Sequence, residues 1–259
     1  MQGIHETLNA IEDYANWSEA RAHILSEKPE YLLPAIPSSE RRVLSESDSK
    51  QWLKRNNIKV PKGSSVSSKK LGEAALEVGY PVALKMVSSR LAHKTEAGAV
   101  ALNIEDKNSL NRAAKKMKID VTAYDAKATS DLFLVEEMSP KPLAELIINM
   151  RQDPQFGAAL VLGSGGVLVE LLADSVTLLL PTRPVEIIRA IKSLQVGRLL
   201  EGFRGRPAAD IPKLAEEIYK LSIAFQEDIK SIAEIEINPL FVYQTEVTAI
   251  DALIQVLNK

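Results

Sequence analysis

Residues 234–239 read Glu-Ile-Glu-Ile-Asn-Pro, an alternation of polar and apolar side chains that ends at a proline. A period of two is typical of a strand with one buried face, so we expect Glu234, Glu236 and Asn238 to share the other face. Two carboxylates and an amide oxygen are the hard oxygen ligands that Mg²⁺ prefers. Asp251 follows on the next predicted strand, within reach of the same place. A solvent-exposed polar face is the alternative, but Glu and Asn are depleted in strands, which favours a metal site.

The rest of the chain mixes short strands with helices. Apolar runs bounded by Gly, Asp and Pro predict further strands at residues 81–87, 98–104, 132–136, 145–150, 158–162, 167–172, 240–243 and 247–250. Helical spacing of apolar residues predicts helices at residues 7–27, 45–55, 67–78, 107–118, 184–194 and 211–226. Short strands with tight connections, mixed with helices throughout, indicate an α+β fold with largely antiparallel sheets rather than a doubly wound parallel sheet.

The composition excludes several classes of protein. Of the 259 residues, 46% are hydrophobic, which is enough for a core, and the formal net charge of −2 gives no bias toward nucleic acid or anionic membrane. Cysteine is absent and the three histidines lack zinc-ligand spacing, which argues against disulfides, thiolate chemistry and a structural zinc site. The first residues do not form a signal peptide and no apolar run is long enough to span a bilayer, so we expect a soluble, cytoplasmic protein.

Lys85 lies within the otherwise apolar strand predicted at 81–87. Burying an unpaired ammonium group is costly, so Lys85 either reaches solvent at a sheet edge or meets an anion such as a phosphate. The loop that follows, residues 88–98, carries Lys94 and Gly98 between two predicted strands. Such a loop can present backbone N–H groups and a cation to phosphates, although an ordinary solvated hairpin loop is the alternative.

Three further segments could take part in a binding site. Glu136, Glu137 and Met138 end an apolar strand, where adjacent acids could serve a ribose or an adenine amino group, or could be plain surface carboxylates. Two glycine-rich loops allow close approach of a ligand to the backbone, although each could simply turn the chain. Their candidate phosphate-binding residues are Gly163, Gly165 and Gly166 in the first loop, and Arg204 and Arg206 in the second. The first loop matches neither the Walker P-loop nor a dinucleotide fingerprint.

Taken together, the motifs occur in a specific order. Along the chain they are Lys85, the His93-Lys-Thr-Glu-Ala-Gly98 loop, the Asp153-Pro-Gln-Phe-Gly157 turn, Gly163-Ser-Gly-Gly166, Gly202-Phe-Arg-Gly-Arg-Pro207 and Glu236-Ile-Asn-Pro239. That order resembles the β-subunit or β-domain of ADP-forming (NDP-forming) acyl-CoA synthetases, which are similar to the β-subunit of succinyl-CoA synthetase. The resemblance covers about Val43 to Asn258.

The resemblance implies an ATP-grasp fold, in which two α+β lobes with largely antiparallel sheets clamp ATP. It implies a helical connector or linker at residues 1–42, consistent with the breakers Pro29, Pro34 and Pro37. The N-terminal lobe would then span residues 43–136 and the C-terminal lobe residues 137–259.

The resemblance also implies roles for individual residues. The ATP-binding residues would be Lys85, Lys94 and Gly98 at the phosphates, Glu136, Glu137 and Met138 at the adenine hinge, and Glu145 near the ribose. Glu236, Asn238 and Asp251 match positions that hold Mg²⁺ and handle the phosphoryl group, with Glu236 counted as catalytic. His93 matches a catalytic histidine that carries phosphate between sites.

The implied reaction joins an acid and CoA at the expense of ATP, giving acyl-CoA, ADP and phosphate through an acyl phosphate and a phosphohistidine. The principal phosphohistidine and the CoA-binding domain belong to an α-subunit or α-domains, for which this chain has no candidate, so it would work as part of a hetero-oligomer or fused chain. Two alternatives remain open at this point. One is a regulatory ATP-grasp module of a fused protein acetyltransferase, and the other is a carboxylate–amine ligase.

Overall fold

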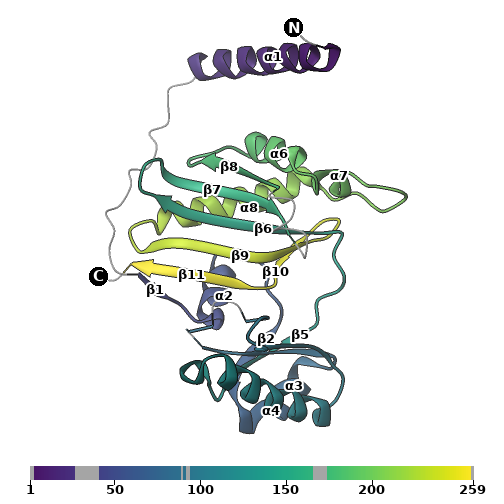
Figure 1. Cartoon of the computed structure of the whole chain (residues 1–259), viewed down its shortest axis with the longest axis vertical. Helices are drawn as coiled ribbons and strands as arrows, with labels where there is room; N and C mark the ends of the chain where they lie inside the picture. The colour runs from purple at the N-terminus through teal and green to yellow at the C-terminus, as the bar shows by residue number, and fades with distance from the viewer. Residues whose placement is uncertain (1–2, 27–40, 89, 92–93, 166–173, 258–259) are drawn as a thin grey trace. The chain divides into compact units, whose positions relative to one another are not determined.

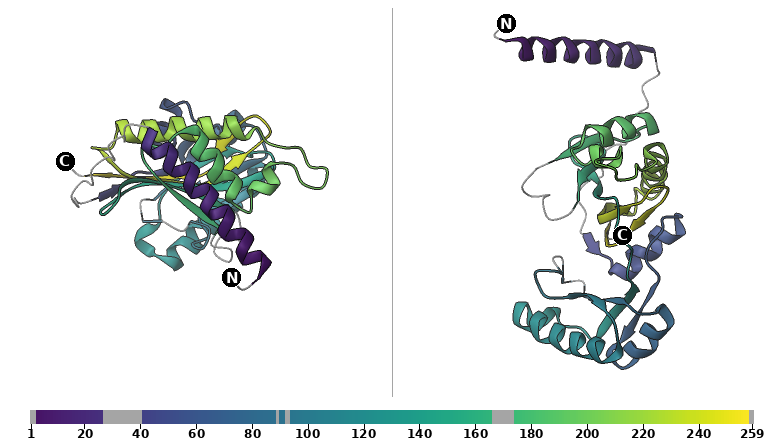
Figure 2. Two further views of the ribbon diagram at one scale, coloured as in Figure 1. Left: turned by 90° about the horizontal axis from the view of Figure 1, so that it is seen from above. Right: turned by 90° about the vertical axis from the view of Figure 1, so that its right-hand side faces the viewer.

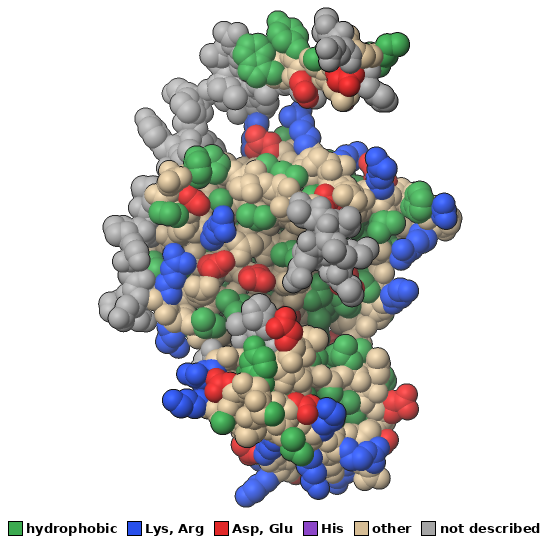
Figure 3. Space-filling view, in the orientation of Figure 1, with side chains coloured by type: hydrophobic (Ala, Val, Ile, Leu, Met, Phe, Trp, Pro, Cys, Tyr) green, Lys and Arg blue, Asp and Glu red, His purple; other side chains and the backbone are tan. Residues whose placement is uncertain are grey.

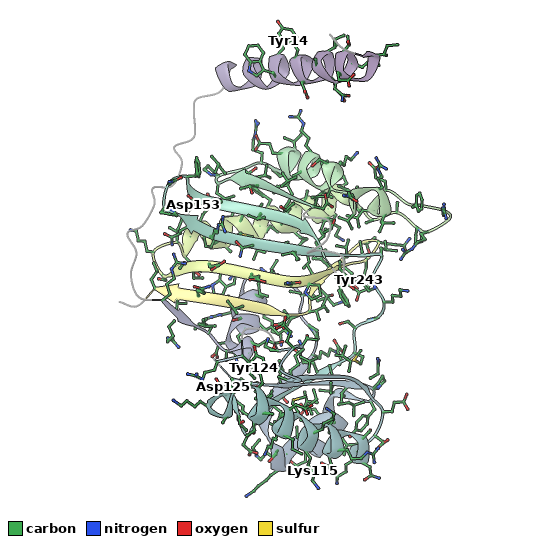
Figure 4. All side chains as sticks on the ribbon, viewed as in Figure 1. Tyr14, Lys115, Tyr124, Asp125, Asp153 and Tyr243 are labelled. Carbon is green, nitrogen blue, oxygen red and sulfur yellow. The ribbon has the colours of Figure 1, made fainter. Side chains whose placement is uncertain are left out.

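The computed structural model describes residues 3–26, 41–88, 90–91, 94–165 and 174–257. It consists of two compact units, Met1–Leu32 and Leu33–Lys259, each treated by itself below. The first unit contains helix α1 (Ile4–Ser26), close to the helix predicted at 7–27. Among its described side chains, Ile4, Leu8, Ile11, Tyr14 (labelled in Figure 4) and Trp17 are exposed, and the rings of Tyr14 and Trp17 lie with their centroids 5.9 Å apart.

The second unit is built on a seven-stranded sheet in which all pairings are antiparallel (Figure 1). The strand order is β1-β11-β9-β6-β7-β8, and the short strand β10 also pairs with β9. The strands of this large sheet are β1 (Arg41–Val43), β6 (Ala144–Asp153), β7 (Gly157–Ser164), β8 (Ser175–Leu179), β9 (Ile232–Val242), β10 (Val247–Ala249) and β11 (Ala252–Leu257).

Helices cover one face of the large sheet, as the two views of Figure 2 show. They are α6 (Pro184–Ser193), α7 (Gly197–Leu200) and α8 (Ile211–Glu227). Alternate residues of β6, including Leu146, Ile148 and Met150, are fully buried against these helices. The residues between them lie on the opposite face of the sheet, which is therefore the face that can receive a ligand.

A second, four-stranded sheet has its own core. Its order is β2-β5-β3-β4, again antiparallel. Its elements are β2 (Gly63–Ser67), the short helices η1 (Ser68–Lys70) and η2 (Ala126–Ala128), α3 (Leu71–Val78), β3 (Val82–Met86), β4 (Val100–Ile104), α4 (Lys107–Tyr124) and β5 (Leu132–Glu137). Helices α3 and α4 pack on one face, against Leu84, Met86, Phe133 and Val135.

Helix α2 (Glu46–Arg55) contacts elements of both sheets. Ser45 caps its start by accepting a hydrogen bond from Asp48 N at 3.1 Å, as the Ser-x-x-Asp pattern predicts. Trp52 and Leu53 on its apolar side join the core of the large sheet, and β1 just before it pairs with β11. The expected boundary at residue 43 therefore assigns to the first lobe a helix that packs against the second, and the lobe limits stay predictions.

The fold class is confirmed: helices accompany two antiparallel sheets. Several elements differ from expectation. β1, β2, β8, β11, η2 and α7 were not predicted. The strand expected at 232–238, which carries the alternation of Glu and Ile, and the strand expected at 240–243 form the single strand β9. The strand predicted at 167–172 lies outside the described residues. Residues 63–67 escaped prediction because Gly and Ser are typical of turns, whereas pairing with β5 over the whole segment holds them extended.

The surface carries charges of both signs, interspersed on the face that Figure 3 presents. In the part of the chain that the structure describes, no helix is long and apolar enough to cross a membrane. The cytoplasmic location stays a prediction.

Candidate functional site

A cluster of six charged side chains lies where α2, the two sheets and the loop before β4 meet. Three are lysines and three are carboxylates, so their formal charges cancel. The members are Glu46 and Lys50 of α2, Lys85 of β3, Lys94 of the loop, Glu136 of β5, and Asp251 in the connection from β10 to β11. We refer to these six residues as the ionic cluster.

Of the two alternatives for Lys85, solvent or an anion, the structure shows an anion, and that anion is protein carboxylate. Its Nζ donates to Glu46 Oε1 at 2.6 Å and to the carbonyl oxygen of Ile250 at 2.9 Å, and lies 3.1 Å from Glu136 Oε2. Burial by itself would lower the pKa of Lys85, but the charges of Glu46 and Glu136 outweigh burial and raise it above its ordinary value. Lys85 is therefore a firmly charged cation held by both lobes.

Lys94 bridges the loop before β4 and the end of the large sheet. Its Nζ donates to Glu46 Oε2 at 2.6 Å and to both oxygens of Asp251 at 2.8 and 2.9 Å. Burial lowers the pKa of Lys94, but the charges of Asp251 and Glu46 outweigh it and raise the pKa. Asp251 in turn lies beside Asn238, since its carbonyl oxygen accepts a hydrogen bond from Asn238 N at 3.2 Å.

Two members of the ionic cluster, Glu46 and Lys50, were missed in the sequence. Lys50 Nζ lies 2.6 and 2.7 Å from the two Glu136 oxygens and 2.8 Å from Glu46 Oε1. Burial, together with the charge of Lys85, lowers the pKa of Lys50 despite Glu46 and Glu136. The available signal was a Glu and a Lys four residues apart on a predicted helix, but that spacing is also the commonest surface ion pair.

Glu46 is the carboxylate that contacts all three lysines of the ionic cluster. Burial raises the pKa of Glu46, but the charges of Lys85, Lys50 and Lys94 outweigh burial and hold the pKa well below its ordinary value. The carboxylate is thus fully ionised at neutral pH, and it joins α2 to the small sheet and the loop.

The polar face predicted for residues 234–239 is present. Ile235 and Ile237 are buried in the core, whereas Glu234 and Glu236 lie half-buried on the opposite face and Asn238 is exposed. Glu234 accepts hydrogen bonds from Asn149 Nδ2 at 2.7 Å and Gln255 Nε2 at 2.6 Å, so it is already occupied. Glu236 and Asn238 are the members of this face that are left to bind a cation.

The donors of the candidate metal site suit Mg²⁺ in their chemistry. Glu236, Asn238 and Asp251 supply oxygen ligands, and the cross-strand neighbour of Glu236, Asn149, has a buried side-chain oxygen with no hydrogen-bond partner among the described residues. An acceptor oxygen beside a carboxylate fits a site that receives a cation. Among the described residues, no three His, Cys, Asp or Glu side chains converge on a ready-made metal site. Both carboxylate oxygens of Asp251 accept hydrogen bonds from Lys94 Nζ.

A pocket of about 300 Å³ opens beside the ionic cluster. Its lining comes from α2, from the segment leading into β2, and from β5, and it includes Lys50, Ser65, Leu134 and Glu136. The hydroxyl oxygen of Ser65 is buried and has no hydrogen-bond partner among the described residues. The volume is at the lower end of small-molecule sites, about 300–1,000 Å³.

The expected hinge residues lie at the junction of the two sheets. The carboxylate of Glu136 faces the lysines, while Glu137 Oε1 accepts a hydrogen bond from Lys62 N at 3.0 Å. Met138 Sδ lies 3.5 Å from Asn103 N. The hydroxyl of Tyr243, labelled in Figure 4, donates to the carbonyl oxygen of Pro140 at 2.9 Å and so ties the connecting segment to the large sheet.

The first glycine loop approaches β6 closely. Gly165 N donates to the carbonyl oxygen of Glu145 at 2.7 Å, and a Cβ added at Gly165 would lie 2.7 Å from the Glu145 carbonyl carbon. Gly163 lies within β7. Gly166 and His93, both predicted site residues, lie outside the described residues. The loop therefore meets Glu145 through backbone, a contact that requires glycine.

Three other candidate residues lie apart from the ionic cluster. Gly98 adopts a positive φ of 66°, and a Cβ there would meet Asp120 at 2.8 Å. Arg204 and Arg206 are exposed; Arg204 lies over the Phe203 ring at 5.2 Å, and Arg206 donates to the Leu143 carbonyl oxygen at 3.3 Å. No contact joins either arginine to the six charged residues in the described part of the chain.

Two antiparallel α+β lobes, with paired lysines facing a carboxylate-bearing sheet, define the ATP-grasp class. A family model described as an ATP-grasp domain matches residues 35–256, and the chain belongs to that family. Among curated relatives, subunit beta of acetate–CoA ligase (ADP-forming) I from Pyrococcus furiosus is 33% identical over 216 residues, 83% of this chain and 92% of the relative. Within the ATP-grasp family, the chain therefore groups with the β subunits and domains of ADP-forming acyl-CoA synthetases.

Longer relatives also match. 4-Hydroxybutyrate–CoA ligase (ADP-forming) of Nitrosopumilus maritimus is 30% identical over 250 residues, which is 94% of this chain and 36% of that protein. The chain thus spans about a third of the long ligases and nearly all of the separate β subunits.

Solved structures agree. The dinucleotide-forming acetyl-coenzyme A synthetase 1 of Ca. Korarchaeum cryptofilum, solved with coenzyme A, Ca-AMPCP and HgCl⁺, has a TM-score of 0.78 at 30% identity, covering 84% of this chain and 94% of that chain. A protein of Pyrococcus horikoshii has a TM-score of 0.79 at 30% identity, covering 85% and 93%.

Proposed function

We propose that the chain is the ATP-binding, phosphoryl-transfer part of an ADP-forming acyl-CoA synthetase, which converts an acid, CoA and ATP into acyl-CoA, ADP and phosphate. The observation that carries the proposal is that Lys94 contacts Asp251, which lies beside Asn238, while Lys85 donates to the carbonyl oxygen of Ile250, the residue before Asp251. Cations from one lobe and oxygen ligands from the other are the two requirements of a site for a metal-bound triphosphate. Phosphoryl transfer depends mainly on such positioning and charge neutralisation.

In this proposal, Lys94 and Lys85 hold the phosphates. Of these two lysines, Lys94 is the more exposed, since its side chain is 15% exposed against 5% for Lys85. Lys94 is therefore the first to reach a phosphate, while Lys85 supplies a fixed positive charge behind it. The segment of Glu136, Glu137 and Met138 would contact the adenine, and Glu145, beside the glycine loop, would lie near the ribose.

Glu236, Asn238 and Asp251 would hold Mg²⁺, which supplies neutralisation of phosphate charge when bound. A solved relative, 28% identical, was crystallised with Mg-AMPPCP. If Asp251 held the metal, Lys94 would keep Glu46 as a partner and its ammonium group would be available to phosphate. The same carboxylate would thus serve the lysine in one state and the metal in the other.

The proposed enzyme is incomplete without an α-part. Some relatives are named as β subunits, whereas in others the matching region is about a third of one long chain. Coenzyme A and a phosphohistidine segment are present in a solved relative. We propose that an α-subunit or α-domains supply the CoA site and the phosphohistidine, with His93 receiving or passing the phosphoryl group. The curated relatives described above are ligases, which supports a catalytic rather than a regulatory part.

Isothermal titration of the whole chain with ATP, with and without Mg²⁺, tests the proposal. One site whose affinity rises with Mg²⁺ is the expected result. AMP should bind more weakly than ATP, because it lacks the phosphates that the lysines hold. The proposal fails if millimolar ATP does not bind either to the chain alone or to the chain joined with its α-part.

A further inference from the structure

The carboxylate of Glu46 has a bridging geometry. One of its oxygens accepts from Lys85 Nζ and the other from Lys94 Nζ, each at 2.6 Å. The two ammonium groups therefore lie no further apart than two hydrogen bonds and one carboxyl group can span. A phosphate group presents two acceptor oxygens on one central atom in the same way.

We propose that Glu46 is a positioning residue of the proposed nucleotide site, holding Lys85 and Lys94 as a pair that can take one phosphate group together. The inference rests on the proposed function and adds to it a residue that belongs to neither the predicted lysines nor the metal ligands.

Electrostatics explains why the pair requires such an anchor. Lys50, Lys85 and Lys94 would repel one another in a buried place, and separate carboxylates, Glu136 and Asp251, hold them from opposite sides. Glu46 is the member of the ionic cluster that contacts all three lysines. Without it, we expect the repulsion to move Lys94 away, because Lys94 is carried by a loop and is the most exposed of the three.

Helix α2 makes the anchor rigid. Ser45 fixes the first turn, in which Glu46 lies, and Trp52 Nε1 donates to Asp228 Oδ2 at 2.8 Å. Leu53 is fully buried in the core of the large sheet. The carboxylate thus has a fixed position relative to the large sheet, as preorganised binding demands.

The experiment compares Glu46→Gln with the unaltered full-length chain by calorimetric titration with Mg-ATP, Mg-ADP and adenosine. Glu46→Gln should lower the affinity for ATP and for ADP by roughly tenfold or more, which is the effect of about one charge-assisted contact. The affinity for adenosine should not change. Asp48→Asn is the matched control, because Asp48 lies in the same turn but is exposed and, among the described residues, its side chain bonds only Ser45. It should bind all three ligands as the unaltered chain does.

A double-mutant cycle separates positioning from a general structural role. If Glu46 acts through Lys94, Glu46→Gln added to Lys94→Met should cost little further ATP affinity. Three results would each overturn the inference. They are an equal loss of affinity for ATP and adenosine in Glu46→Gln, fully additive effects of the two substitutions on ATP affinity, and tighter ATP binding by Glu46→Gln. Should Glu46→Gln not fold, Glu46→Asp replaces it; the shorter carboxylate cannot reach both lysines and should also bind ATP more weakly. Absence of ATP binding by the unaltered chain, alone and with its α-part, overturns the proposed function itself, a result distinct from a failure confined to the variants.

Discussion

The Nζ atom of Lys94 lies 2.8 and 2.9 Å from the two carboxylate oxygens of Asp251. A lysine beside the small sheet thereby neutralises an acid that precedes the last strand of the large sheet. The contact places a proposed phosphate ligand on a proposed metal ligand, so the two halves of the site cannot be altered independently.

Asp251→Asn should abolish most of the Mg²⁺ dependence of ATP binding, because the neutral amide is a weaker ligand for a hard cation. The ratio of ATP affinities with and without Mg²⁺ should fall by about tenfold or more. Titration calorimetry measures both affinities. Glu246→Gln is the control, since Glu246 is exposed, lies on the neighbouring hairpin and forms its ion pair with Lys59. An unchanged ratio in Asp251→Asn would remove Asp251 from the metal site.

Lys94→Met should lower the affinity for Mg-ATP more than the affinity for adenosine, because it deletes a cation and leaves the adenine contacts intact. The expected loss for ATP is about tenfold to a hundredfold. Lys59→Met, which removes an exposed lysine paired with Glu246, is the matched control. Equal affinities of Lys94→Met and the unaltered chain for ATP would show that the phosphates lie elsewhere.

The acid stability of the second unit should depend on Glu46. Its pKa is held below the ordinary value of 4.5, so its contribution to stability is complete above pH 4.5 and is lost as the pH falls through the lowered pKa. Glu46→Gln lacks this contribution and should show a shallower loss of stability below pH 4.5. Urea unfolding at a series of pH values measures the slope. Identical slopes for the two proteins would contradict a buried, ionised Glu46.

Gly165→Ala should destabilise the fold by about 1–3 kcal/mol, because the new methyl group would press on backbone atoms of Glu145 at 2.7 Å. Gly163→Ala is the comparison, since its nearest neighbour is the Asp174 carbonyl oxygen at 3.3 Å. Thermal unfolding should therefore show a larger decrease in Tm for Gly165→Ala. The reverse order would mean that the loop does not rest on β6.

His93→Ala should spare ATP binding and stop turnover of the enzyme reconstituted with its α-part, because a relay residue acts after ATP has bound. Calorimetry checks the first expectation and an acyl-CoA synthesis assay the second. Survival of turnover would make His93 an ordinary loop residue.

Local patterns were sufficient for much of the fold. The Ser45 cap and the alternation of Glu236 with Ile235 and Ile237 were predictable because hydrogen bonding and side-chain period act within a few residues. An anion beside Lys85 was one of the two outcomes that its apolar strand predicted, because burying an unpaired ammonium group is costly. β11 escaped because an apolar run near a chain end does not by itself distinguish a strand from a helix.

Four of the six members of the ionic cluster were predicted as site residues, and Glu46 and Lys50 were not. Nothing near Glu46 or Lys50 in the sequence indicates burial, because an acid and a lysine one helical turn apart are common on exposed helix faces. Their burial arises from strands that lie far along the chain: Lys50 and Glu136 are 86 positions apart. Which charges become buried together is decided by tertiary packing, and a single sequence carries little trace of it.

Helix α2 has a practical consequence for anyone dividing this protein. A fragment cut at residue 136 would keep α2 but lose the large sheet, leaving Trp52, Leu53 and Ile58 without their apolar surroundings. In the complementary fragment, the core residues of the large sheet that pack against α2 would be exposed, and the sheet would lack its edge strand β1. Neither piece is an independent folding unit, so expression of the lobes as separate proteins should give aggregation-prone material, and soluble fragments would have to keep residues 41–257 in one chain.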